Sequence, residues 1–275
     1  MSEPDHPQKA HFSGLFHRAS ETYDAVGVDF FAPLAGALVD RADLAAGDAV
    51  LDLGCGRGAA LFAAAEAVGP DGHVLGLDLA PGMVERTARD AADHGLAHVE
   101  VRLGDADHPP AGSWDAVIAS FVLFFLPDPV ATATRIREVL RPGGRFVVST
   151  FDVADPRWKV VETAVSPFWP PTDEPSHPAT KSHFSSTAAV EELLGDAGFV
   201  DVGTVLIEHA NVYRDVQQWL DWTWSAGARI IWERVPEADR EAAQAAACDV
   251  VADLVESDGT LRERFTVRLH RAVAP

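Results

Sequence analysis

The sequence has few of the residues that cross-link a chain, bind nucleic acid or cross a membrane. Its 275 residues include only two cysteines, Cys55 and Cys248, which lie too far apart to indicate a disulfide framework. With 22 basic and 42 acidic residues, the formal charge of −20 would repel nucleic-acid phosphates and anionic lipids. The longest apolar run, Ala116 to Leu126, is far shorter than the roughly 20 residues of a membrane-spanning helix. We therefore expect neither nucleic acid nor a membrane as a partner.

The start of the sequence, MSEPDHPQKAHF, is polar and lacks the apolar centre of a signal peptide. Together with the scarcity of cysteine, this predicts a soluble protein of the reducing cytoplasm. Hydrophobic residues make up 47% of the chain, which is enough for a well-buried core. The length suits one large compact domain.

The first 150 residues alternate short apolar runs with longer segments of helical spacing, a pattern typical of crossover units on a parallel sheet. We therefore predict a doubly wound α/β sheet. The expected strands are Ala49–Leu53, His73–Leu77, His98–Leu103, Ala116–Ser120 and Arg145–Phe151. The expected helices between them are Ala59–Val68, Pro81–His94 and Val130–Leu140.

The composition changes after Phe151. Five prolines within Ser166–Pro178 exclude a helix interior or a central strand and predict a loop or lid. A helix over Ala188–Phe199 and strands over Val202–His209 and Arg264–His270 should follow. Between those strands, Asn211–Gly259 is mostly helical in character.

A glycine-rich turn follows the first predicted strand, in the stretch VLDLGCGRG. Gly54, Gly56 and Gly58 permit positive φ angles and let a ligand lie against the main chain. The third glycine comes one position earlier than in the dinucleotide pattern G-x-G-x-x-G, which argues against NAD. Asp52, two residues before the turn, would repel an anion and attract a cation, so the expected ligand carries ammonium or sulfonium.

Two further acids follow the next two strands. Asp78 ends the second strand, twenty residues beyond Gly58, where a carboxylate can accept both hydroxyls of a ribose. Asp105 follows the third strand and could reach an adenine amino group. Because ligands bind beyond the carboxyl ends of parallel strands, three acids are expected to line one site.

Five motifs between Val50 and Phe151 resemble, in their order and spacing, those of class I S-adenosylmethionine-dependent methyltransferases. The resemblance is to the branch that acts on quinones and small natural products. The motifs are VLDLGCGRG (Val50–Gly58), GLDLAPGMV (Gly76–Val84), GDA (Gly104–Ala106), WDAVIASFVLFFLPDP (Trp114–Pro129) and LRPGGRFVVSTF (Leu140–Phe151). The resemblance implies S-adenosyl-L-methionine as cofactor, S-adenosyl-L-homocysteine as product and a small-molecule acceptor. The implied acceptor position is a phenolic or enolic oxygen, or a ring carbon, of a secondary metabolite or quinone-like compound.

The same resemblance implies a role for each cofactor residue. Asp52 and the turn from Gly54 through Cys55 and Gly56 to Gly58 would hold the methionine portion, and Asp78 the ribose. The residues expected around the adenine and at the methionine end are Leu79 and Met83, Asp105 with Ala106, and Ser120 with Phe121. Tyr23 would close over the cofactor from an amino-terminal helical cover.

The implied fold is a Rossmann-like, doubly wound sheet of seven strands whose last strand is antiparallel, with one reversed strand at the edge. A helical insertion would precede the last strand. We expect one compact unit made of a helical cover at 1–45, a cofactor-binding core at 46–152, and a lid, the remaining strands and a substrate-binding insertion at 153–275.

Because a sulfonium methyl is already activated, the chemistry needs mainly alignment and exclusion of water. A phenol or enol could also need a base, for which His17 and His183 are the first candidates, ahead of His11 and His177. No pattern of metal ligands is evident. The tryptophans at 219, 222 and 224 are expected to pack as core, and would favour a flat acceptor if they face the cleft.

Other functions stay open at this point. A carbon acceptor such as an isoprenoid diphosphate would need cations near the lid, for which the candidates are Arg157, Lys159, Lys181 and His183. A non-methylating binding protein, a cyclase or a dehydrogenase would share much of the fold. The sequence leaves the acceptor and the oligomeric state undetermined.

Overall fold

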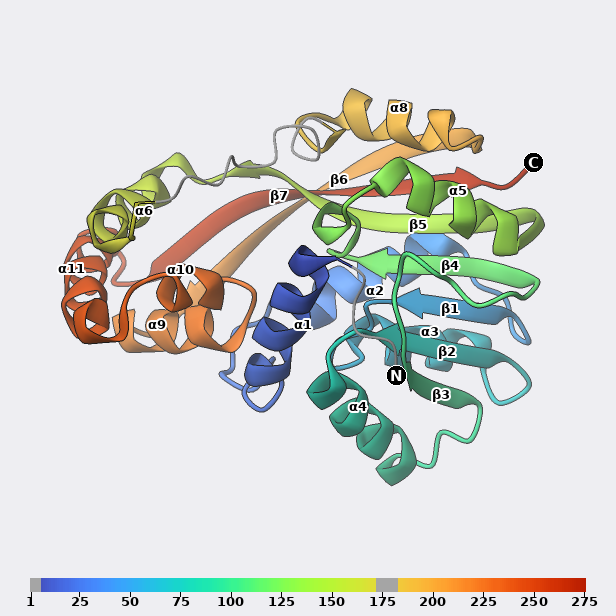
Figure 1. Ribbon diagram of the computed structural model, residues 1–275, viewed down its shortest axis with the longest axis horizontal. Coiled ribbons are helices and arrows are strands. Elements are labelled where there is room, and N and C mark those ends of the chain that lie inside the picture. Colours follow the sequence, from blue (N-terminus) through green and yellow to red (C-terminus); the bar gives the residue numbers. More distant parts are fainter. Residues whose placement is uncertain (1–5, 172–182) are drawn as a thin grey trace.

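A seven-stranded sheet forms the centre of the computed structural model, which describes residues 6–171 and 183–275 (Figure 1). The strands follow the order β3-β2-β1-β4-β5-β7-β6 across the sheet. Their bounds are β1 Ala49–Leu53, β2 His73–Asp78, β3 Val99–Leu103, β4 Trp114–Ser120, β5 Leu140–Ala154, β6 Val200–Tyr213 and β7 Leu261–Val273. The reversal of order between β1 and β4 is the switch point at which the strand tips of such a sheet bind ligands.

The last strand is reversed, as predicted, but it does not lie at the edge. Strands β1 to β5 pair in parallel, whereas β7 runs antiparallel to both β5 and β6 and lies between them. The edge strand is β6. Hydrophobic alternation indicates which face of a strand is buried but carries no information about its neighbours, so this detail of the prediction was wrong.

Helices cover both faces of the sheet. Ala59–Val68 is helical with the predicted bounds, and the other predicted helices differ by one or more residues at their ends. Buried side chains of α2 and α3 form one core with Val50, Val74 and Ile118, while those of α5 and α8 form a second core on the opposite face. The helices are α1 Pro7–Ala19, α2 Phe31–Ala42, α3 Ala59–Val68, α4 Pro81–Asp93, α5 Pro129–Val139, α6 Lys159–Val165, α8 Thr187–Asp196, α9 Val216–Ser225, α10 Arg229–Glu233 and α11 Arg240–Ala252.

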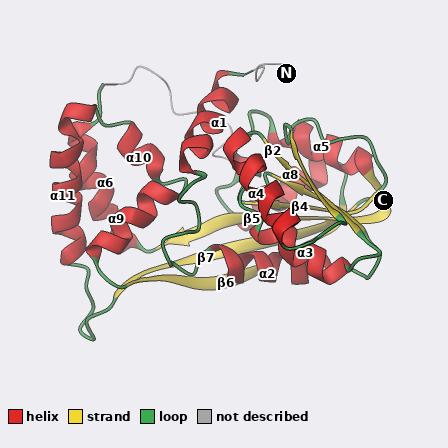
Figure 2. Cartoon of the chain, turned by 90° about the horizontal axis from the view of Figure 1, so that it is seen from below, coloured by secondary structure: helices red, strands yellow, loops and turns green. Residues whose placement is uncertain are grey.

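Strands β5, β6 and β7 are longer than predicted and extend beyond the rest of the sheet. Helices α6, α9, α10 and α11 gather at their far end (Figures 1 and 2). We call these four helices the cap. The predicted insertion at Asn211–Gly259 contains α9 to α11, although its first residues still belong to β6.

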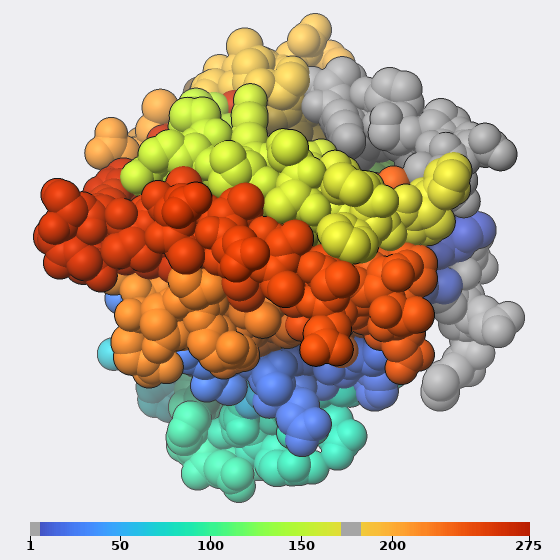
Figure 3. Space-filling view, turned by 90° about the vertical axis from the view of Figure 1, so that its left-hand side faces the viewer, coloured from blue at the N-terminus to red at the C-terminus, as the bar shows by residue number. Residues whose placement is uncertain are grey.

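Helix α1 joins the two parts of the molecule. It contacts α4 of the sheet region and α10 of the cap, and the space-filling view shows it packed beneath the cap helices (Figure 3). Most of the predicted lid, 172–178 with His177, and Lys181 lie outside the described residues. Within the described part of the chain, every helix is too short or too polar to cross a membrane.

Candidate active site

A large cavity of about 620 Å³ lies between the strand tips, α1 and the cap. Its two ends differ in chemistry. The carboxylates of Asp52, Asp78 and Asp105 line one end, and aromatic rings line most of the rest. The cavity therefore joins a polar pocket to an apolar chamber.

The glycine turn after β1 forms the floor of the polar end. Gly54 and Gly56 line the cavity with φ angles of +68° and +52°, and a side chain at Gly54 would collide with Val122. The backbone carbonyl of Gly56 accepts a hydrogen bond of 2.7 Å from the Thr87 hydroxyl of α4. The turn therefore requires glycine to keep its conformation, and a hydrogen bond from α4 holds it in place.

Asp52 is buried in the sheet, with only 1% of its surface exposed, yet it lines the cavity. Neither of its carboxylate oxygens has a hydrogen-bond partner. Burial, with a smaller contribution from the charge of Asp78, raises the pKa of Asp52 to about 8. An unpartnered buried carboxyl group at a strand tip is costly unless a ligand supplies a donor or a positive charge. This environment fits a cationic ligand.

Asp78 is held in place by the main chain. Its two oxygens accept hydrogen bonds from the backbone N–H groups of Gly56 and Ala80, each at 2.8 Å. Burial raises the pKa of Asp78, and these two hydrogen bonds partly oppose that rise. The carboxylate is therefore oriented before any ligand binds.

Asp105 has a cationic partner that the sequence analysis did not anticipate. The Lys9 ammonium of α1 lies 2.7 Å from Asp105 Oδ2 and 2.5 Å from Asp107 Oδ2, and Lys9 is buried. Burial would raise the pKa of Asp105, but the Lys9 hydrogen bond and the Asp107 backbone N–H together hold that pKa below its usual range. Helix α1 is thus ion-paired to the cavity wall.

The structure brings most of the predicted cofactor residues together around this cavity. Gly58 does not line it; with φ +85° it begins α3, and a Cβ atom there would lie 2.5 Å from the Phe62 ring. Its conformation therefore has a structural cause. The predicted residues that line the cavity are Tyr23, Asp52, Gly54, Cys55, Gly56, Asp78, Leu79, Met83, Asp105, Ala106, Ser120 and Phe121.

The two histidines predicted as bases lie elsewhere. Nδ1 of His17 accepts a hydrogen bond of 3.0 Å from Gly82 N, and His17 borders a separate shallow pocket between α1 and the start of α4. His183 is partly buried and does not line the cavity. No histidine in the described ranges lines it. The geometry therefore gives no support to either residue as a base.

Aromatic side chains line most of the remaining cavity wall, and five of them, from separate segments, form one connected group. The Phe30 ring lies 5.5 Å from those of Phe121 and Trp222 and 5.7 Å from that of Phe265, and Phe121 stacks on Phe151 at 4.6 Å. These spacings are those of favourable ring pairs. We call Phe30, Phe121, Phe151, Trp222 and Phe265 the aromatic chamber. Its size and composition suit a flat apolar molecule.

The tryptophans have both of the roles considered above. Trp219 and Trp222 are buried in the core and also line the cavity. Trp224 instead stacks on Trp232 within the cap, and the Arg229 guanidinium lies over the Trp224 ring in a cation–π contact. The spacing of the tryptophans in the sequence predicts that they lie on a helix. It does not show which face of that helix meets the cavity.

The far end of the cavity contains a polar group that the sequence analysis missed. Asn211 and Glu263 lie directly opposite each other on β6 and β7, and both line the cavity. Their separation of about fifty residues in sequence left no local signal. Burial raises the pKa of Glu263, despite hydrogen bonds from Tyr213 and Asn211.

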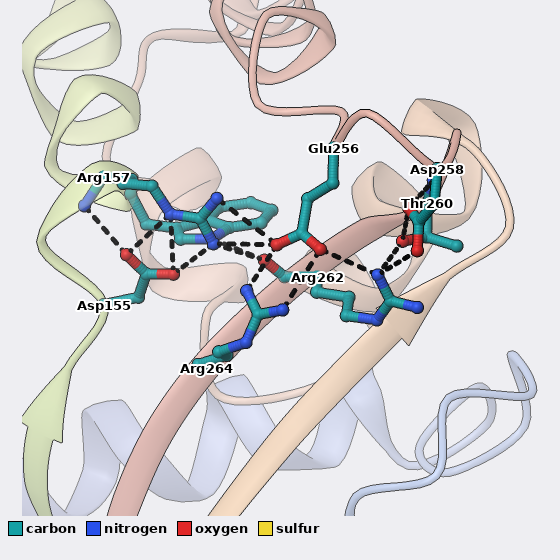
Figure 4. A network of polar contacts seen from close by, with 8 residues as sticks. Asp155, Arg157, Glu256, Asp258, Thr260, Arg262 and Arg264 are labelled. Atoms are coloured by element: carbon teal, nitrogen blue, oxygen red, sulfur yellow. Dashed lines mark hydrogen bonds and ion pairs between the residues drawn. The ribbon is translucent and has the colours of Figure 1, made fainter.

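The cations along the wall are neutralised by carboxylates. Among the described residues, those lining the cavity are Lys9, Arg57 and Arg264. Arg57 pairs with Asp90 at 2.5 Å, and Arg264 joins Arg157 and Arg262 around Glu256 (Figure 4). Arg157 also pairs with Asp155.

In the part of the chain that the structure describes, no group of three or more His, Cys, Asp or Glu side chains could hold a metal ion.

Comparisons with known proteins agree with this geometry. A family model described as a methyltransferase domain matches residues 44–191. Nocamycin O-methyltransferase of Saccharothrix syringae is 42% identical over 87% of this chain and 89% of its own. Aklanonic acid methyltransferase DauC of Streptomyces sp. (strain C5) is 40% identical over 63% of this chain and 76% of its own. Among solved structures, phosphoethanolamine N-methyltransferase 2 of Haemonchus contortus, in complex with S-adenosyl-L-methionine, shares the fold. The match has a TM-score of 0.56 at 16% sequence identity and covers 98% of this chain and 58% of the other.

Proposed function

This chain belongs to the methyltransferase-domain family, as a class I S-adenosylmethionine-dependent methyltransferase of the natural-product type, and we propose that it methylates an acidic oxygen of a flat, polycyclic or quinone-like acceptor. The observation that carries the proposal is the continuity of one cavity from three strand-tip carboxylates to the aromatic chamber. Cofactor and acceptor can therefore meet in a single cavity.

The polar end is the proposed cofactor site. Asp52, whose oxygens lack partners, would attract the positive charge of the methionine portion, and the oriented carboxylate of Asp78 would accept the ribose hydroxyls. The Gly54–Gly58 turn would allow the cofactor to lie against the main chain. When bound, S-adenosyl-L-methionine supplies the activated methyl group.

The aromatic chamber is the proposed acceptor site. Its rings would hold a planar molecule by stacking and would exclude water from the reacting atoms. Because no histidine of the described residues lines the cavity, the acceptor oxygen should ionise readily by itself, as an enol or a phenol beside a carbonyl group does. Catalysis then rests on alignment of this oxygen with the methyl group. The names of the two relatives, an O-methyltransferase and an aklanonic acid methyltransferase, support an oxygen acceptor of this kind.

An isoprenoid diphosphate acceptor has less support. A diphosphate needs several free cations, whereas Lys9, Arg57 and Arg264 are each paired with a carboxylate. Arg157, one of the cations considered above, is paired with Asp155 and Glu256. The chamber itself is aromatic and apolar.

Methyl-labelled S-adenosyl-L-methionine tests the proposal. The enzyme would be incubated separately with 2-hydroxy-1,4-naphthoquinone and a set of tricyclic enols and phenols, and with geranyl diphosphate. We expect label in an O-methyl product from at least one enol or phenol and none in the diphosphate. Label in the diphosphate alone, or cofactor binding with no labelled product from any acceptor, would contradict it.

A further inference from the structure

The end of the cavity farthest from the strand tips contains a small polar cluster made of Asn211, Tyr213 and Glu263. The side chains at 211 and 213 lie on one face of β6, and register pairs Asn211 directly with Glu263 of β7. The Tyr213 hydroxyl donates to Glu263 Oε2 at 2.6 Å, and Asn211 Nδ2 donates to the Tyr213 oxygen at 3.1 Å and to Glu263 Oε2 at 3.5 Å. The donors of the cluster are thus used within it.

The acceptors of the cluster are not all used. Asn211 is 3% exposed and lines the cavity, but its Oδ1 atom has no hydrogen-bond partner. The orientation of the amide follows from its neighbours, because Nδ2 faces the accepting carboxylate of Glu263. A buried polar atom without a partner costs free energy, and in native structures such an atom calls for an explanation.

The neighbouring arginines do not neutralise Glu263. Arg264 lines the cavity as Glu263 does, but Arg262 and Arg264 alternate with Glu263 along β7 and neither is ion-paired with it. Both are bound to Glu256 (Figure 4). The charges of the neighbouring arginines are thus balanced by Glu256, and the acceptor of the cluster that is left without a partner is Asn211 Oδ1.

A continuous row of rings separates this cluster from the cofactor end. Phe121 at the tip of β4 contacts Phe30, Phe30 contacts Phe265, and Glu263 lies two residues along the same face of β7. The rings of Phe30 and Phe265 therefore lie between the cluster and Phe121 at the tip of β4. We therefore expect the cluster to contact the end of an acceptor that lies away from the strand tips.

We propose that Asn211 and Glu263 form a distal anchor that binds an O–H or N–H donor at the end of the acceptor opposite to the methylated oxygen. The inference rests on the proposed function, in that the chamber holds the acceptor. It adds that the acceptor is elongated, with a hydroxyl or amino group at its far end. These residues would then set substrate specificity, because an acceptor without the donor would leave Asn211 Oδ1 buried and unpaired.

Matched tricyclic probes test the anchor without knowledge of the natural acceptor. The probes are anthraquinone, 2-hydroxyanthraquinone and 2-aminoanthraquinone, titrated with S-adenosyl-L-homocysteine present at saturation. Quenching of the cavity tryptophans at 158, 219 and 222 would report binding. We expect the hydroxy or the amino probe to bind about tenfold more tightly than anthraquinone, as one added buried hydrogen bond allows. The preferred probe identifies the donor as O–H or N–H.

Two variants assign the preference to the cluster. Asn211→Leu should abolish the preference, and Glu263→Gln, which keeps the shape of the side chain, should reduce it. Val212→Leu is the control, because Val212 lies on the same strand but is half exposed on the other face. Unchanged S-adenosyl-L-homocysteine affinity would show that each variant is folded.

The outcomes separate this inference from the proposed function. Equal binding of all three probes to the wild type, or a preference that survives in Asn211→Leu, would overturn the anchor alone. Failure of all three probes to bind, with normal S-adenosyl-L-homocysteine affinity, would overturn the anchor together with the flat-acceptor chamber.

Discussion

The ammonium of Lys9 lies 2.7 Å from Oδ2 of Asp105, so the amino-terminal helix is ion-paired to the sheet edge at which the sequence motifs predict the adenine. Removing one partner of a buried pair leaves an uncompensated charge. We expect Lys9→Met to lower the melting temperature and to expose α1 to protease. Because Phe12 and Ser13 of α1 line the cavity, S-adenosyl-L-homocysteine affinity should also fall, by about tenfold or more for a lost buried pair.

Lys159→Met is the control for this variant, since Lys159 is exposed on α6. The pKa of Asp105 is lowered in the folded protein, so its stabilising contribution is present above its unfolded pKa of about 3.9 and is lost as pH falls through the folded value. The melting temperature of Lys9→Met should therefore fall less steeply in acid than that of the wild type. Equal affinity and equal acid sensitivity would show that the pair does not support the site.

Asp52 should couple cofactor binding to proton release. Burial raises its pKa to about 8, well above the ordinary value near 3.9, so the folded protein holds a proton on Asp52 between about pH 4 and pH 8 that the unfolded chain has lost. In the absence of ligand, this group makes the free energy of unfolding decrease as pH rises through that window. A cationic ligand favours the ionised form and would expel the proton.

Calorimetry at pH 7 in phosphate and in Tris measures this release, because the two buffers take up a proton with different heats. We expect the binding enthalpy of S-adenosyl-L-homocysteine, which keeps the ammonium group, to differ between buffers for the wild type and not for Asp52→Asn. The variant should also bind more weakly. Asp40→Asn, an exposed change on α2, should behave as the wild type. A buffer-independent enthalpy for the wild type would argue against an ion pair at Asp52.

The two glycines at 56 and 58 should respond differently to alanine. At Gly58, φ is +85° and the new Cβ would meet the Phe62 ring, so we expect a loss of about 1 to 3 kcal/mol in the free energy of unfolding, with the cofactor affinity of the folded protein kept. Gly56→Ala also strains a positive φ, of +52°, but its Cβ has room beside Tyr23 and lies at the cavity wall, so beyond this strain it should weaken S-adenosyl-L-homocysteine binding.

Gly69→Ala serves as the reference for backbone strain in urea unfolding, because its φ is +67° and nothing lies within 4 Å of the new Cβ. Gly58→Ala should lose more stability than this reference. A Gly58→Ala protein as stable as Gly69→Ala would show that Phe62 adds no constraint at the turn.

Phe30 should matter for the acceptor and not for the cofactor. Its ring contacts Phe121, Trp222 and Phe265 in the middle of the chamber. We expect Phe30→Leu to weaken binding of 2-hydroxyanthraquinone by about tenfold, through lost ring contacts, with little change for S-adenosyl-L-homocysteine. Phe62→Leu, a partly buried ring outside the cavity, is the matched control. Equal loss in both variants would point to a general loss of stability.

The sequence was informative wherever the signal is local. Strand Ala49–Leu53 and helix Ala59–Val68 have the predicted bounds, and acids at successive strand ends do converge on one cavity. Periodicity and turn residues determine these features, because each depends on neighbours along the chain.

Features that depend on distant pairing were not predictable in this way. The contact of Lys9 with Asp105 and the register that places Asn211 opposite Glu263 join segments far apart in sequence. The position of β7 between β5 and β6 has the same origin. His17 was a reasonable candidate by composition, but the orientation of α1 turns its ring toward Gly82.

Calorimetric titration of the wild-type protein with S-adenosyl-L-methionine, beside an identical titration with NAD, tests the central claim most directly. The account predicts saturable binding of one S-adenosyl-L-methionine per chain and no heat with NAD. A folded protein that gives no heat with S-adenosyl-L-methionine, or that binds NAD instead, would contradict it.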